Sequence, residues 1–345
     1  MPEIRAPPGV RSVDPAARCG RTTGMDRRRF LLAAAGLPVS LALGARLAFA
    51  SHLSPVALVT ADLESHVVVL DLAGARVLGR IPTAPGPRSI ERVGIDAALV
   101  AHTQHGLVSI LDARRRAVRL ELDGFSAPRY TAAHPVRGVA YVTDSAARQV
   151  VTVDVDRGRI VSRTQVPGPA RHVSLSPGGS TLWTSLGSKA ERIAALDVRE
   201  ALRPRLIRTI EPPFLAHDVV FAPAGKHVWV TSGAGHRVAV YRSDTREIVR
   251  VLAADRAPQH VAFADGLAFV ASGDDGTVRV HRLNGDLVRR DEVPLGSYNV
   301  TFGARHALTP SLSRGTVSVL DATGRVRAVR RIARAAHDAC IVSTP

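Results

Sequence analysis

The chain has 345 residues and a formal net charge of +16, and 46% of its residues are hydrophobic while only 4% are aromatic. This length allows one large domain or two ordinary ones, and the apolar content suffices for a core built mainly of Val, Leu, Ile and Ala. The two cysteines, Cys19 and Cys340, are too few for a fold held together by a disulfide framework.

The first fifty residues have the character of a leader rather than of a folded domain. Residues 1–24 are rich in Pro, Arg and Gly, and we interpret them as a disordered, over-extended start that precedes the true first residue, Met25. Three consecutive arginines at 27–29 then precede an apolar run over 30–45, and small residues occupy positions 48 and 50. This order predicts a secretory signal peptide over residues 25–50.

The beginning of that leader resembles the twin-arginine export signal. The usual form of the signal is Arg-Arg-x-Phe-Leu, and Arg27-Arg28-Arg29-Phe30-Leu31 supplies it. The apolar run is short for a membrane span, which needs about 20 residues. We therefore expect a protein exported by the twin-arginine route to the periplasm or the extracellular space, with no transmembrane span after the signal is cleaved.

From residue 51 onward, short apolar runs alternate with turn residues, which predicts strands rather than long helices. Each repeat carries a run of the Ala-Tyr-Val-Thr type, and the seven copies lie at 57–60, 98–101, 140–143, 182–185, 228–231, 268–271 and 307–310. About ten residues further on, a second run ends in Asp at positions 71, 112, 154, 197 and 321, and in Arg at positions 242 and 282.

A pair of polar residues opens a third apolar run in every repeat. The seven pairs are Arg88-Ser89, Arg129-Tyr130, Arg171-His172, His217-Asp218, Gln259-His260, Tyr298-Asn299 and His337-Asp338. Their spacing of 39 to 46 residues is typical of a four-stranded propeller blade. We predict that residues 51–345 form an all-β, seven-bladed β-propeller. The longest repeat holds residues 200–213, which we interpret as an insertion rich in Pro and Arg.

The order of the strands predicts how the ring closes. The folded part begins with a second strand at 56–60 and ends with an innermost strand at 337–343. The C-terminal strand must therefore complete the N-terminal blade, which removes edges that would otherwise pair with other chains. Cys340 on this strand is expected to be a small buried hydrophobe.

The Tyr-Val-Thr strand followed by Val-x-Val-x-Asp, as in Tyr141-Val142-Thr143 and Val151 to Asp154, resembles the YVTN repeats of the YncE-like propellers. The resemblance covers essentially all of residues 51–345. It implies the WD40-like, seven-bladed fold and says little about function, because such propellers serve in binding, redox and hydrolytic roles.

The innermost strands of a propeller line its channel, so the polar pairs should meet at one mouth of it, with Glu91 deeper. Arginine can hold a carboxylate or phosphate by two parallel hydrogen bonds. We predict a site for a small anionic ligand there, formed by Arg88, Arg129, Tyr130, Arg171, Gln259, Tyr298 and Asn299. Because successive strand residues point to opposite faces, only half of the paired residues need reach the axis.

The other side of the predicted ring is rich in metal-ligating residues. Imidazole and carboxylate suit zinc, iron or copper, and a divalent metal is the cofactor that this set would bind. The candidates are His172, His217, Asp218, His260, His337 and Asp338. A structural interpretation competes with this one, because a wet channel is polar in any case and Asp next to His can tie strand ends together. Loop residues His66, His102, His105, Asp144 and His236 are expected to be solvated.

These patterns favour a binding or scaffold protein whose ligand lies at the polar mouth of the channel. The alternative is a metal- or cofactor-dependent enzyme, lactonase-like or redox, that uses the same His, Asp and Arg residues. No catalytic residue stands out, since there is no Gly-x-Ser-x-Gly motif, and the absence of Cys-x-x-Cys-His excludes covalent c-type haem. We expect a monomer that binds a small anion or a protein; the positive charge also allows nucleic acid, which the scarcity of aromatic residues disfavours.

Overall fold

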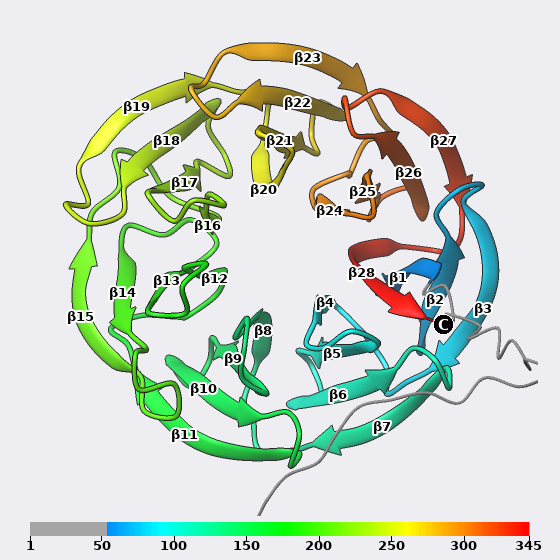
Figure 1. The fold of residues 1–345 in the computed structure, drawn as a ribbon, viewed down its shortest axis with the longest axis horizontal. Coiled ribbons are helices and arrows are strands. Elements are labelled where there is room, and N and C mark those ends of the chain that lie inside the picture. The colour runs from blue at the N-terminus through cyan, green and yellow to red at the C-terminus, as the bar shows by residue number, and fades with distance from the viewer. Residues whose placement is uncertain (1–53, 345) are drawn as a thin grey trace, which may run out of the picture. The chain divides into compact units, whose positions relative to one another are not determined.

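The computed structural model of the protein describes residues 54–344, which form seven four-stranded antiparallel sheets arranged as blades around a ring (Figure 1). The predicted seven-bladed β-propeller is therefore confirmed. The leader predicted over residues 25–50 and the start predicted over 1–24 lie outside the described residues. Within 54–344, no helix is long and apolar enough to cross a membrane.

Every blade is built in the same order, from the centre of the ring outward (Figure 1). The innermost strands are β28 (Ala336–Thr344), β4 (Ser89–Arg92), β8 (Pro128–Ala133), β12 (Val173–Leu175), β16 (Val219–Phe221), β20 (Pro258–Ala264) and β24 (Thr301–Gly303). The second strands are β1 (Ser54–Ala61), β5 (Ala97–His102), β9 (Val139–Asp144), β13 (Thr181–Ser185), β17 (His227–Thr231), β21 (Leu267–Ser272) and β25 (His306–Pro310).

A third and an outermost strand complete each blade, and the third strands contain the predicted apolar run that ends in Asp or Arg. The third strands are β2 (His66–Asp71), β6 (Leu107–Asp112), β10 (Gln149–Asp154), β14 (Ile193–Asp197), β18 (Arg237–Arg242), β22 (Thr277–Arg282) and β26 (Thr316–Asp321). The outermost strands are β3 (Arg76–Pro82), β7 (Ala117–Leu122), β11 (Arg159–Gln165), β15 (Arg205–Ile210), β19 (Ile248–Ala253), β23 (Leu287–Glu292) and β27 (Val326–Arg331).

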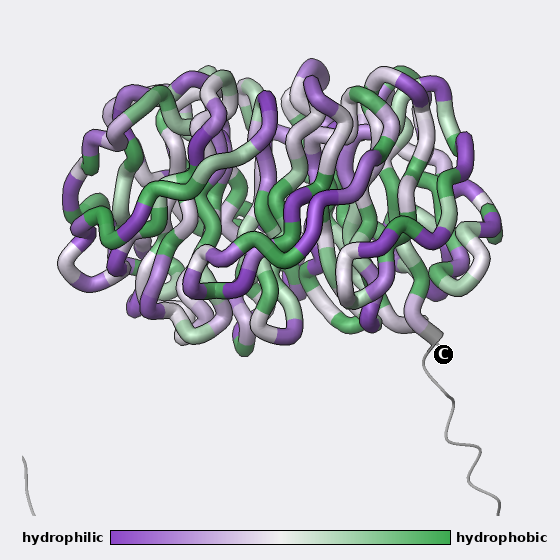
Figure 2. Tube along the Cα trace, turned by 90° about the horizontal axis from the view of Figure 1, so that it is seen from above, coloured by the Kyte–Doolittle hydropathy of each residue, from purple (hydrophilic) through white to green (hydrophobic). Residues whose placement is uncertain are grey.

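The core lies between neighbouring blades, and this explains the unbroken apolar runs of the second and third strands. A strand that is covered on both faces has no solvent side, so it does not alternate apolar with polar residues. All six residues of β9 and of β10 are buried, whereas the outermost β15 is mostly exposed. Between the fourth and fifth blades, Trp183 and Tyr241 pack edge to face with their ring centroids 5.8 Å apart. Green apolar segments accordingly run through the strands in Figure 2.

The aspartates that end most third strands shape the turn to the outermost strand. Asp112 and Asp154 each accept a hydrogen bond from the backbone N–H three residues further on, at 2.8 and 2.9 Å. An Asp side chain that binds the backbone in this way favours a tight turn. The pairing of third and outermost strands also shifts register by a bulge in all seven blades, which increases the local twist.

The segment interpreted as an insertion, residues 200–213, is not one, because it contains the outermost strand β15, which pairs with β14. The prolines mark the ends of this strand: Pro204 precedes it, and Pro212 and Pro213 follow it. Proline cannot donate to a strand ladder and is tolerated at strand ends and edges. The extra length of this repeat lies in the connections before β14 and before β15, residues 186–192 and 198–204, which hold seven residues each where the other blades have four or five.

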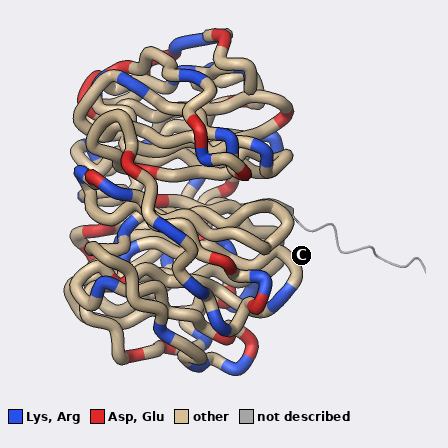
Figure 3. Tube along the Cα trace, turned by 90° about the vertical axis from the view of Figure 1, so that its left-hand side faces the viewer, with Lys and Arg blue, Asp and Glu red and all other residues tan. Residues whose placement is uncertain are grey.

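The C-terminal strand closes the ring as predicted. β28 pairs antiparallel with β1, with Val56 opposite Val342 and Leu58 opposite Cys340. Cys340 is 4% exposed and lies in the core between the first two blades. Basic and acidic residues are interspersed over the side of the ring seen in Figure 3, as expected for a solvated surface biased towards arginine.

Removing residues 336–345 should therefore abolish the stable ring. The truncated chain would leave β1 with an unpaired edge and uncover apolar residues of two blades, so we expect it to aggregate or to melt at least about 10 °C below the full chain. Thermal unfolding and light scattering measure both effects, and a synthetic peptide of residues 336–345 should restore part of the stability. A truncated protein that stays monomeric and melts with the full chain would contradict this role of β28.

Candidate functional site

The polar pairs line two connected cavities along the channel. The first residues of the pairs line the mouth cavity, of about 300 Å³: Arg88, Arg171, His217, Gln259, Tyr298 and His337. The second residues line the channel cavity, of about 370 Å³: Tyr130, His172, Asp218, His260, Asn299 and Asp338. Tyr130, His260 and Asn299 border both. Alternation along each strand thus divides the predicted residues between two levels.

Threonines of the second strands hold the pairs in position. The hydroxyl of Thr231 accepts a hydrogen bond from the backbone N–H of Asp218 at 3.0 Å and donates to the carbonyl oxygen of Gln259, in the next blade, at 2.9 Å. Thr60 and Thr143 make the same bridge to the carbonyls of Arg88 and Arg171. Each such hydroxyl links the innermost strands of two adjacent blades just where the polar pair begins.

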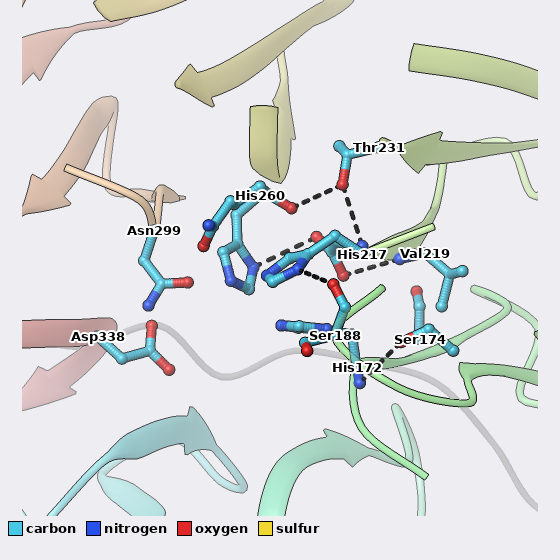
Figure 4. Close-up of polar contacts among 12 residues, drawn as sticks. His172, Ser174, Ser188, His217, Val219, Thr231, His260, Asn299 and Asp338 are labelled. Carbon is cyan, nitrogen blue, oxygen red and sulfur yellow. Dashed lines mark hydrogen bonds and ion pairs between the residues drawn. The ribbon is translucent and has the colours of Figure 1, made fainter. Parts of the chain in front are cut away.

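Three of the predicted metal-ligating residues converge in the channel. One ring nitrogen from each of His172, His217 and His260 lies within 4.8 Å of the others. They come from three consecutive blades, and their rings point towards one another (Figure 4). The His172 ring also lies 4.1 Å from that of Tyr130, measured between ring centroids. We call these three residues the histidine cluster.

Neighbouring groups fix two rings of the cluster and leave the third unpartnered. Nδ1 of His217 lies 2.9 Å from the carbonyl oxygen of Ser188, and Nδ1 of His260 lies 3.3 Å from the Asp218 carboxylate. Nδ1 therefore carries the proton that each ring donates, and Nε2 is left to bind a ligand. His172 is 1% exposed, and neither of its ring nitrogens has a hydrogen-bond partner among the described residues.

Burial keeps the imidazoles of His172 and His217 neutral. Loss of solvation lowers the pKa of His217 to about 3, with a further contribution from His260. Loss of solvation, followed by the neighbouring His217 and His260, also holds the pKa of His172 well below its usual range. A charged imidazole is disfavoured where water is excluded. The neutral imidazole is also the form that binds metal ions.

The second His-Asp pair lies outside the cluster and has structural contacts. Nδ1 of His337 lies 2.8 Å from the carbonyl oxygen of Arg88. The Asp338 carboxylate accepts hydrogen bonds from the backbone N–H groups of Ile90 at 3.0 Å and Ala339 at 2.8 Å. These bonds join the innermost strands of the first two blades, as the structural interpretation of such pairs expects.

An acidic region occupies the channel cavity near Asp338. Burial raises the pKa of the Asp338 carboxyl to about 6, with Asp218 contributing and His260 opposing. Glu91 also lines this cavity, and burial together with the charge of Asp338 raises its pKa to about 8. Near pH 7, the Glu91 carboxyl is therefore mainly protonated.

The three arginines differ in their surroundings. Arg88 forms an ion pair with Asp62 at 2.7 Å. Arg129 donates from Nε to the Ser145 hydroxyl at 3.2 Å and borders neither cavity. Arg171 lines the mouth cavity, and within the described residues its buried Nε has no hydrogen-bond partner and its guanidinium no carboxylate partner.

The remaining predicted binding residues partly serve the scaffold. The side-chain amide of Asn299 donates to the carbonyl oxygen of His337 at 2.7 Å, and the Tyr298 hydroxyl donates to Asp274 at 2.8 Å. Two further residues of the mouth cavity, Ser188 and Lys189, lie in the connection between β13 and β14. That connection has no pattern in the sequence that singles out a backbone carbonyl as the partner of His217.

Two residues expected to be solvated are fully buried instead. His102 has its Nδ1 3.0 Å from the carbonyl oxygen of Pro85 and its Nε2 2.9 Å from the Ser109 hydroxyl. The Asp144 carboxylate accepts hydrogen bonds from the backbone of residues 126 and 127. Both side chains therefore provide hydrogen-bond partners for buried polar groups in the connections between strands. His105 and His236 are exposed, as expected.

The raised pKa of Glu91 predicts how stability depends on pH. The folded state holds this proton up to about pH 8 and the unfolded state only to about 4.5, so the contribution to stability falls as pH rises through that window. Relative to Glu91→Gln, the wild type should lose up to about 1.4 kcal/mol of unfolding free energy per pH unit between pH 5 and 8. Urea unfolding measures this difference. The exposed control Glu211→Gln should keep a constant difference from wild type, and the same constancy for Glu91→Gln would contradict the assignment.

Known proteins resemble this chain in fold rather than in sequence. No protein-family model matches it, and no curated protein matches it. A functionally unknown protein from Desulfotomaculum acetoxidans aligns with a TM-score of 0.73 at 13% identity, over 84% of this chain and 99% of that one. A chain of Kuenenia stuttgartiensis hydrazine synthase aligns with a TM-score of 0.68 at 17% identity, over 76% and 91%. AztD of Citrobacter koseri aligns with a TM-score of 0.65 at 12% identity, over 84% and 98%. At these identities the likeness shows that the chain shares the β-propeller fold.

Proposed function

We propose that this protein binds one divalent transition metal ion, zinc or copper, through His172, His217 and His260 in the channel of the propeller. The observation that carries the proposal is the histidine cluster itself, which contains a buried imidazole with no hydrogen-bond partner among residues 54–344. An unpartnered buried polar group costs free energy, commonly about 1–3 kcal/mol. A ligand that uses its nitrogen would remove this cost.

The chemistry of the cluster fits a borderline metal ion. Neutral imidazoles suit zinc, copper, iron and nickel, and copper binds most tightly in the usual order of affinity. Tetrahedral zinc with bonds of about 2.0–2.1 Å places its nitrogen ligands roughly 3.3 Å apart. The observed limit of 4.8 Å means that the rings must approach one another by about 1.5 Å at most. Three protein ligands leave a fourth position open.

The surroundings of the cluster support the same proposal. Metal-binding histidines usually donate their second ring N–H to a carboxylate or a backbone carbonyl, which fixes the ring and the tautomer. His260 has the Asp218 carboxylate in this role, and His217 has the carbonyl of Ser188. The Asp218 carboxylate is itself held by the backbone N–H of Val219 at 2.8 Å.

We further propose that the protein acts as an exported binding protein of the YncE-like type. The support is the sequence of residues 25–50, which has the order of a twin-arginine signal, and the repeat pattern of Tyr-Val-Thr strands. A protein exported through that route folds before it crosses the membrane, so a metal acquired during folding would be carried with it. Binding of a ligand in the channel requires no catalytic residue.

Metal analysis tests the proposal directly. The metal-free full chain should bind one Zn²⁺ per molecule, and His172→Ala, His217→Ala or His260→Ala should each weaken binding by at least about 100-fold, because loss of an outer-sphere partner alone costs 10–100-fold. Calorimetry and elemental analysis measure this, with thermal unfolding as a check of the fold. The exposed His105→Ala and the structural His337→Ala should retain the metal. Equal binding by all five variants would exclude the cluster as the site.

The carboxylate of Asp218, which contacts His260 and is not itself a proposed metal ligand, provides an independent prediction. Asp218→Asn should preserve the fold, because an amide oxygen can still accept from the backbone of Val219, but it should weaken Zn²⁺ binding about 10–100-fold. Competition with a chromophoric chelator measures the affinity. An unchanged affinity would mean that Asp218 only ties the strand and does not orient His260.

A further inference from the structure

We infer that the site binds its metal together with a small oxyanion, a carboxylate or a phosphate, held between the metal and Arg171 in the mouth cavity. The inference rests on the proposed metal site and adds the chemical class of its second ligand. It draws on the charge of the site, on the place of Arg171 and on the open coordination position.

A metal in the histidine cluster would bring positive charge that needs a partner. Neutral imidazoles donate electron pairs but do not cancel the charge of a divalent cation, and the ion is then the largest local charge in the site. Asp218, behind His260, supplies one negative charge. Arg88 is already paired with Asp62, which leaves Arg171 as a further positive charge facing the same cavity. A divalent metal and Arg171 together carry more positive charge than the single charge of Asp218 balances.

The mouth cavity places basic side chains beside the histidine cluster. Arg171 and Lys189 line it together with His217 and His260 from the histidine cluster. A ligand in this cavity can therefore contact both a metal on the cluster and the guanidinium. The volume of about 300 Å³ is ample for acetate or phosphate. The acidic side chains Glu91 and Asp338 line the channel cavity instead.

Arg171 differs from the other two arginines of the pairs in its hydrogen bonds. Its Nε is buried and has no partner within the described part of the chain, whereas Arg88 and Arg129 both have side-chain partners. Arginine offers a planar fork of donors that matches a carboxylate or phosphate and cannot lose its charge in a protein. An oxyanion on the metal would accept from this fork and so satisfy the guanidinium and the fourth coordination position together.

Metal and anion should therefore bind cooperatively. An anion lowers the repulsion between the metal and Arg171, and by linkage the metal raises the affinity for the anion by the same factor. Co²⁺ serves as the probe, because its visible absorption reports the ligands around it. Co²⁺ is titrated into the metal-free full chain at fixed ionic strength with no added oxyanion, with sodium acetate and with sodium phosphate.

In the wild type, acetate or phosphate should raise the Co²⁺ affinity by about 5- to 150-fold and change the visible spectrum. In Arg171→Met the enhancement should be lost, while the affinity without oxyanion should equal or exceed that of wild type, because a repelling charge is gone. The matched control is Arg192→Met, an exposed arginine, which should keep the enhancement. Arg171→Lys retains the charge without the planar fork of donors and should keep only part of the oxyanion enhancement. This variant tests the inference if Arg171→Met does not fold.

The outcomes separate the two proposals. Co²⁺ binding that is indifferent to both oxyanions, or an enhancement that persists unchanged in Arg171→Met or Arg171→Lys, would overturn the inference and leave the metal site standing. No Co²⁺ or Zn²⁺ binding under any of the three conditions would overturn the metal site and the inference with it.

Discussion

Hydrogen bonds from second-strand threonines to the next blade are the interaction on which the channel depends. The innermost strands of neighbouring blades belong to different sheets, so no strand ladder fixes their spacing. Thr60, Thr143 and Thr231 supply that link, each by accepting from its own innermost strand and donating to a carbonyl of the next. The bridged backbone groups belong to the polar pairs themselves. In these three blades the threonine that ends the repeated Tyr-Val-Thr run thus also sets where the channel side chains begin.

The same two-residue motif has two different physical roles in this ring. At His337-Asp338 both side chains bond to backbone groups near the closure, and neither belongs to the histidine cluster. At His217-Asp218 the histidine joins the cluster and the carboxylate contacts His260. The two pairs differ in the residue that the next blade places at the second position of its own pair. That residue is His260 next to His217-Asp218 and Ser89 next to His337-Asp338. A buried carboxylate that meets an imidazole can orient it, whereas one that meets only N–H groups serves as a strand tie.

The repeat could be predicted from the sequence because each blade repeats the same local chemistry. Apolar runs on the buried strands, Asp at the turns and a constant spacing are all local features, and the closure by β28 follows from counting strands. The polar pairs predicted that the candidate ligands meet in the channel, but not that only His172, His217 and His260 converge, because that selection depends on how three blades pack and on a carbonyl in the connection at Ser188. The burial of His102 and Asp144 was missed for a related reason, since a polar residue near a turn is expected to face solvent unless its backbone partners are known.

The closure by β28 also sets the order in which the chain can reach its final state during synthesis. The strands from β1 to β27 can pair as they emerge, but the first blade lacks its innermost strand until residues 336–344 have been made. A nascent chain therefore carries an open seam until the residues of β28 leave the ribosome, and such an edge favours pairing with other chains. The blades that hold the histidine cluster, built on β12, β16 and β20, lie across the ring from that seam (Figure 1). The innermost strands β12, β16 and β20 all end more than seventy residues before β28 begins, so this part of the channel can be assembled while the seam is still open.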